Sequence, residues 1–97
     1  MDVWMICVEL IAQTGHDSSP SNLGFMNITM WAGSGETAVG KIRQYIESLG
    51  WHLTSVEKAH VVNEDGKYGD VELDQIERTR NNPNAIILGT FHTYKTN

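Results

Sequence analysis

The segment from Phe25 to Val62 constrains the fold most, because three elements follow one another in it. An alternating run over 25–32 predicts a strand, and a glycine-rich turn follows it. A stripe of apolar residues spaced by about 3.6 then predicts an amphipathic helix over 36–49, which Gly50 should end in a left-handed conformation. A second strand is predicted over 51–62. This order predicts a β-α-β unit with parallel strands and the helix across one face.

The residues before this unit predict one more strand and a long loop. Val3–Gln13 alternates but is apolar on both faces, which is typical of a strand that is central or covered on both sides. Thr14–Gly24 is rich in Gly, Ser, Asn and Pro, and it should connect the first two strands. Loops of this length are often functional, so this segment is a candidate contact loop.

The last third of the chain predicts a short helix and a final strand. Asp70 is expected to cap a helix over 71–80, with Leu73 and Ile76 facing inward, and residues 85–94 alternate as a strand does. The order is ββαβαβ in one domain over residues 1–97. We therefore expect an α+β fold of the ferredoxin-like class of sandwich, in which a single four-stranded mixed β-sheet carries two helices on one face.

The charge balance excludes some partners. Twelve acidic residues face seven basic ones, giving a net charge of −5, so direct binding to nucleic acid is not expected. With Cys7 as the single cysteine, no internal disulfide can form. The apolar N-terminal run is too short to span a bilayer and lacks the pattern of a signal peptide, so no membrane contact and a cytoplasmic location are expected.

Half of the acidic residues gather in one short segment, which is the most unusual feature of the sequence. The cluster comprises Glu64, Asp65, Asp70, Glu72, Asp74 and Glu77. On a helix, Asp70, Asp74 and Glu77 share one face. The common interpretation is a solvated surface, whereas the alternative is a docking surface for a basic protein. Trp31 is predicted on the open face of the sheet, where a large aromatic side chain could anchor such a partner.

Two motif-like patterns point to ligands but lack essential residues. Gly35–Lys41 matches the start of a phosphate-binding loop, yet Ile42 stands where the Mg²⁺-binding Ser or Thr belongs. Asn63–Glu72 resembles most of a calcium-binding loop, yet Val61 occupies the first ligand position. We expect an ordinary helix start and a solvated turn, with no metal, no cofactor and no catalytic residues.

The sequence thus favours a non-enzymatic, protein-binding module. It would be a small acidic inhibitor of bacterial or phage type, such as an immunity protein that docks on a basic nuclease toxin or defence effector, using Asp65, Asp70, Glu72, Asp74, Glu77 and Trp31. The alternative is a small homodimeric enzyme or ligand-binding protein, paired through the open sheet face. Its pocket would be lined by His52, His60, His92 and Tyr94.

Overall fold

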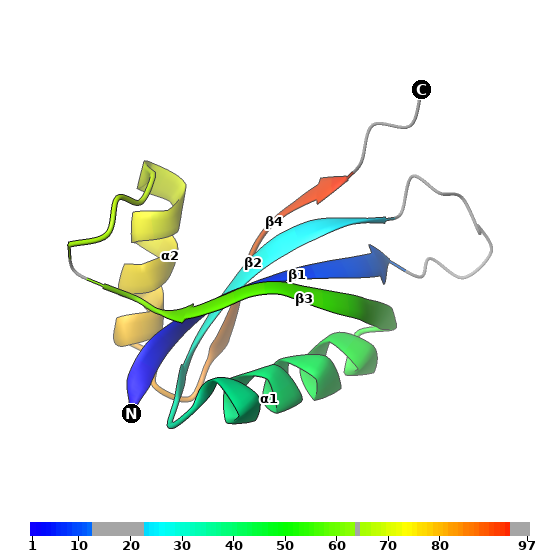
Figure 1. Ribbon diagram of the computed structural model, residues 1–97, viewed down its shortest axis with the longest axis horizontal. Coiled ribbons are helices and arrows are strands. Elements are labelled where there is room, and N and C mark those ends of the chain that lie inside the picture. Colours follow the sequence, from blue (N-terminus) through cyan, green and yellow to red (C-terminus); the bar gives the residue numbers. More distant parts are fainter. Residues whose placement is uncertain (13–22, 64, 94–97) are drawn as a thin grey trace.

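The computed structural model describes residues 1–12, 23–63 and 65–93, and it confirms the α+β class and the order ββαβαβ (Figure 1). The strands are β1 (Asp2–Ala12), β2 (Leu23–Ala32), β3 (Trp51–Val61) and β4 (Ile86–Thr93), and the helices are α1 (Gly35–Ser48) and α2 (Asp70–Arg80). Most of the candidate contact loop, together with Glu64 and Tyr94, lies outside the described residues. Within the described ranges, no helix is long and apolar enough to cross a membrane.

The four strands form one sheet in the order β3-β1-β2-β4, and every neighbouring pair is antiparallel. The prediction of a mixed sheet is therefore wrong. β2 and β3 do run in the same direction, as a β-α-β unit requires, but β1 lies between them and pairs with both. This central position explains why β1 is apolar on both of its faces.

The two helices lie on opposite faces of the sheet, so the prediction that both lie on one face is also wrong (Figure 1). Ile28 of β2 belongs to the main core with Ala38, Ile42 and Ile46 of α1. The next residue, Thr29, points to the other face, because side chains alternate along a strand, and its hydroxyl lies 2.6 Å from that of Thr79 in α2. Each helix therefore covers one of the two buried faces.

Helix α1 forms where the sequence predicts it. The Ser34 side chain caps its first turn by accepting a hydrogen bond from the Thr37 amide at 3.2 Å. Gly50 follows its end with a φ of 84°, a conformation that favours glycine. Gly40 and Lys41 lie in the helix body rather than in a phosphate-binding loop. The segment that resembles such a loop is thus an ordinary capped helix start.

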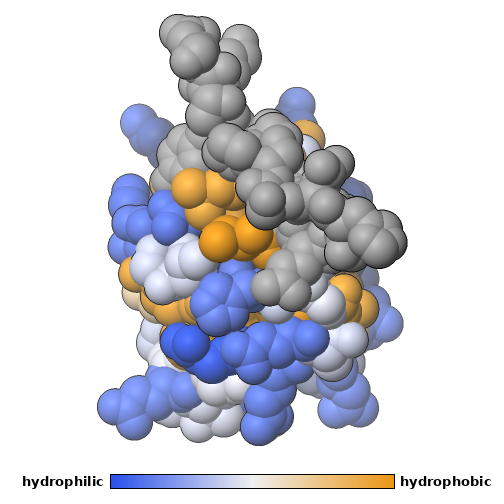
Figure 2. All heavy atoms as spheres, turned by 90° about the vertical axis from the view of Figure 1, so that its right-hand side faces the viewer, coloured by the Kyte–Doolittle hydropathy of each residue, from blue (hydrophilic) through white to orange (hydrophobic). Residues whose placement is uncertain are grey.

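One end of the core is closed by aromatic side chains. Trp51, at the start of β3, and Phe91, near the end of β4, approach with ring centroids 5.4 Å apart. Both pack against the core on the α1 side. Figure 2 looks at the end of the molecule that lies at the right of Figure 1, where a small hydrophobic patch lies above several hydrophilic residues. Ile11 and Leu49 are among the exposed apolar residues of the protein.

Candidate functional site

Helix α2 is held on the sheet by hydrogen bonds at a defect in strand pairing. The pairing of β2 with β4 changes register between Met26 and Ile28. The Gln75 side-chain amide donates to two backbone oxygens there, those of Asn27 and Ile87, both at 3.0 Å. Gln75 is buried, so this amide satisfies carbonyl groups that would otherwise lose their contact with water.

Gly89 makes room for this contact. A Cβ atom at this position would lie 2.6 Å from the Asn27 carbonyl oxygen and 2.9 Å from Gln75 Oε1. Both distances are shorter than side chains tolerate. Gly89 in β4 therefore leaves the space in which Gln75 of α2 can reach the strand backbone and hold the helix on the sheet.

Thr79 fixes the following turn of α2. Its hydroxyl donates to the Gln75 carbonyl at 2.9 Å, so the Thr29 hydroxyl is the donor in the 2.6 Å contact between the two threonines. The indole N–H of Trp31 donates to the Thr79 carbonyl at 2.7 Å. Trp31 is half-buried beside α2, so its predicted place on an open sheet face is wrong. It anchors the helix instead.

These contacts place two polar side chains on the inward face of α2 and leave two apolar ones at its surface. Its buried residues are Gln75, Ile76 and Thr79, of which Ile76 alone is large and apolar. Leu73 is 50% exposed and Val71 is 68% exposed. The predicted inward position of Leu73 is therefore wrong, because the hydrogen-bonded face of the helix takes the inward side. The buried polar groups are the informative feature of this helix, because they take the inward positions and leave two apolar side chains at the surface.

The outer face of α2 carries an acidic ridge, made of Asp70, Asp74 and Glu77. All three are exposed, and their spacing of three and four residues aligns them along the helix. Asp70 is the first residue of the helix, and Gly69 rather than Asp70 is the N-cap. Asp74 lies 3.8 Å from Arg78, and both side chains are mostly exposed, so the pair neutralises the ridge only weakly.

The other two predicted acidic residues do not join this ridge. Glu72 is half-buried and its carboxylate accepts a hydrogen bond from the Gly69 amide at 3.4 Å, which helps to start the helix. Asp65 is exposed in the turn before α2, where its amide donates to Asn63 Oδ1 at 3.1 Å. The structure thus separates the exposed acidic ridge from residues that order its flanking turn.

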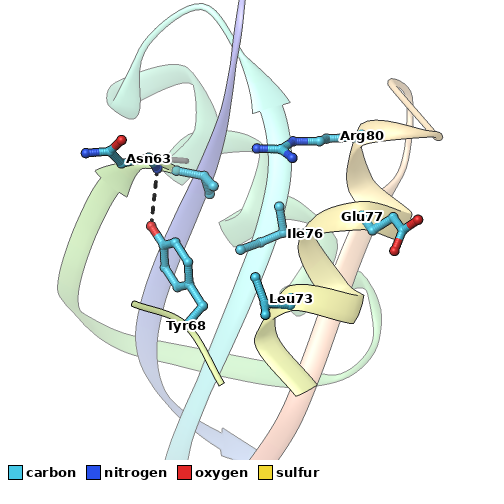
Figure 3. Close-up of a pocket in the computed structure, with 7 residues that line it drawn as sticks. Asn63, Tyr68, Leu73, Ile76, Glu77 and Arg80 are labelled. Carbon is cyan, nitrogen blue, oxygen red and sulfur yellow. Dashed lines mark hydrogen bonds between the residues drawn. The ribbon is translucent and has the colours of Figure 1, made fainter. Parts of the chain in front are cut away.

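A groove of about 440 Å³ runs beside the ridge, between α2 and the end of β3 (Figure 3). We call it the Leu73 groove; it is lined by Val62, Asn63, Tyr68, Leu73, Ile76, Glu77 and Arg80. Leu73, Ile76 and Arg80 reach from the helix toward the opposite wall, whereas Glu77 points away from it. The Asn63 amide donates to the Tyr68 hydroxyl at 3.3 Å and fixes that wall. The groove therefore has an apolar floor and a guanidinium at its rim.

Tyr68 and Arg80 were not among the predicted site residues. Tyr68 follows a polar turn, and Arg80 resembles any charged residue in the last turn of a helix. The signal that could have located the groove is the pair of polar residues, Gln75 and Thr79, at the positions that would face inward with Ile76. Their burial rotates α2 and leaves Leu73 at the surface.

A second groove, of about 470 Å³, lies over the part of the sheet face that includes Cys7, Phe25 and Asn27. Burial raises the pKa of the Cys7 thiol, and the nearby Glu57 carboxylate raises it further, against a smaller opposing effect of Lys58. The thiol therefore stays protonated at neutral pH and is a poor nucleophile. This arrangement offers no activated cysteine.

The described histidines are spread over the sheet. His60 pairs with Met5 and His52 with Ile11 along β3, whereas His92 lies on β4 at the opposite edge. The His60 ring is parallel to that of Tyr68, with centroids 6.3 Å apart. Over residues 1–12, 23–63 and 65–93, no three His, Cys, Asp or Glu side chains are grouped so that they could hold a metal ion. The three histidines therefore do not line one pocket.

Comparisons with known proteins give no information on the function. A scan against models of protein families finds no match, and neither curated proteins nor solved structures give a significant one.

Proposed function

We propose that this protein is a non-enzymatic, protein-binding module that docks on a basic partner through α2. The observation that carries the proposal is the half-exposed Leu73 side chain, which lies between the acidic ridge and the Leu73 groove. An apolar side chain kept at the surface beside a concave site is typical of a protein interface.

The acidic ridge and the groove have complementary roles in this proposal. Asp70, Asp74 and Glu77 attract Lys and Arg side chains of the partner and orient it during approach. An apolar side chain of the partner then enters the groove and loses its contact with water against Leu73 and Ile76. Short-range packing therefore supplies the anchor, and charge supplies the steering.

The net charge favours a partner whose own surface is strongly positive. At −5, the molecule as a whole is attracted to such a surface, and the ridge concentrates this attraction on one element. Nuclease toxins and defence effectors that bind nucleic acid have surfaces of this kind, because they must neutralise phosphate groups. An inhibitor or immunity-type protein, which covers that surface, is the functional class that these features support.

Site-specific photocrosslinking tests the proposal in the cells in which the protein naturally occurs. A photoreactive amino acid replaces Leu73 in one variant and Tyr45, an exposed aromatic residue on α1, in the control. We expect Leu73 to capture a basic protein that Tyr45 does not capture. Reversing the ridge charges (Asp70→Lys, Asp74→Lys and Glu77→Lys together) should abolish the capture. Equal capture from both positions, or an acidic partner, would contradict the proposal.

A further inference from the structure

The two edges of the sheet differ in how they resist pairing with another strand. β3 carries Glu57 and Lys58, and charged side chains discourage pairing at an edge. β4 has the sequence Ile-Ile-Leu-Gly-Thr-Phe-His-Thr, without Asp, Glu, Lys or Arg. No other described strand pairs with its outer edge. β4 is therefore an apolar edge without charged residues to protect it.

The side chains of β4 on the α1 side are only half-covered. Ile86, Leu88 and Phe91 pack against the main core but remain partly exposed. Helix α1 packs chiefly over β3 and β2, which leaves this margin of the sheet less well covered. A strand added beside β4 would complete the burial of these three side chains.

The opposite face of β4 is also incompletely covered. A hollow of about 240 Å³ lies between α2 and β4 and is lined by Val71, Asp74, Gln75, Arg78, Leu88, Gly89 and Thr90. Val71 projects there with 68% of its surface exposed. This flank of α2 lies away from the Leu73 groove and shares only Asp74 with the acidic ridge, so the exposed Val71 is not explained by the proposed docking of a basic protein.

From these features we infer that β4 pairs antiparallel with β4 of a second copy of this chain. The pairing forms one continuous eight-stranded sheet around a two-fold axis. It sets the two α2 helices beside each other, so that each Val71 is covered. Asp74 and Arg78 lie one helical turn apart within each copy, so the antiparallel order of the two α2 helices would set opposite charges across the joint. A second copy thus pairs with the edge of β4, covers the exposed apolar side chains and places opposite charges next to each other.

Sedimentation velocity over a range of concentrations tests this pairing on the full chain. We expect the wild-type protein to be a dimer and both Val71→Glu and Thr90→Lys to weaken dimerisation by about tenfold or more, since each buries an unpaired charge in the joint between the copies. Val61→Glu is the matched control, because Val61 is an exposed apolar residue on the other edge strand. It should leave the dimer intact. Circular dichroism confirms that each variant is folded.

Three results would overturn the inferred pairing. A wild-type protein that stays monomeric overturns the inference and leaves the β4 edge to an extended segment of a different protein. A dimer that survives Val71→Glu, or that is lost in Val61→Glu, places the interface elsewhere and also overturns it. Should Thr90→Lys fail to fold, Val71→Glu decides alone, because an acidic residue in the first turn of α2 favours the helix.

Discussion

Gln75 is the side chain on which the position of α2 most depends, because its amide satisfies two backbone oxygens at a break in strand pairing. Gln75→Leu keeps the approximate size but leaves the Asn27 and Ile87 carbonyls without this donor. We expect the free energy of unfolding to fall by about 2–4 kcal/mol, measured by urea denaturation. Gln44→Leu, at an exposed position of α1, should change it by less than about 0.5 kcal/mol. Similar values for the two variants would contradict this role.

Glycines at two positions should respond oppositely to the same substitution. Gly89→Ala forces a Cβ atom against the Asn27 carbonyl and the Gln75 side chain, so it should destabilise the protein by about 1–3 kcal/mol. Gly40→Ala lies in α1 with nothing within 4 Å of the new atom. It should stabilise the protein by about 0.5–1 kcal/mol, because alanine favours the helix. Thermal unfolding measures the change in stability of each variant. Changes of the same sign in the two variants would contradict this prediction.

At the scale of elements, α2 differs from α1 in what holds it. Its contact with the sheet rests on Gln75, Thr79 and Trp31 with Ile76 as the one large apolar residue, whereas α1 packs through an apolar stripe. Thr79→Val should therefore cost about 1–3 kcal/mol, since it leaves the buried Thr29 hydroxyl without its partner. Adding Thr29→Val should recover part of this loss. A double-mutant cycle of unfolding measures the coupling, and additive effects would mean that the two hydroxyls do not interact.

The same contrast explains which elements could be predicted from the sequence. For α1, the apolar stripe, Ser34 and Gly50 all indicate one helix, and the structure confirms it. Periodicity does not encode strand order, so the insertion of β1 between β2 and β3 was not predictable from local pattern. The hydrogen bonds that turn Gln75 and Thr79 inward depend on strands distant in sequence, so these two polar residues were the one local sign that Leu73 is exposed.

At the scale of the whole molecule, charge should act on the association rate constant of binding more than on the dissociation rate constant. The acidic ridge is part of a net charge of −5, so association with a basic partner should be fast at low salt. Raising the salt concentration from about 0.05 to 0.5 M should lower the association rate constant at least about tenfold, while the dissociation rate constant changes little. Stopped-flow fluorescence measures both rates. An association rate that is independent of salt would exclude a steering role for the ridge.

The affinity for the partner captured at position 73 shows whether α2 is the docking element. The dissociation constant is measured by calorimetry for the wild-type protein, Leu73→Ala and the α1 control Tyr45→Ala, all at one salt concentration. Removing a central apolar anchor should weaken binding by about tenfold to a hundredfold in Leu73→Ala. Tyr45→Ala should bind like the wild type. Equal dissociation constants for all three proteins would show that α2 is not the docking element.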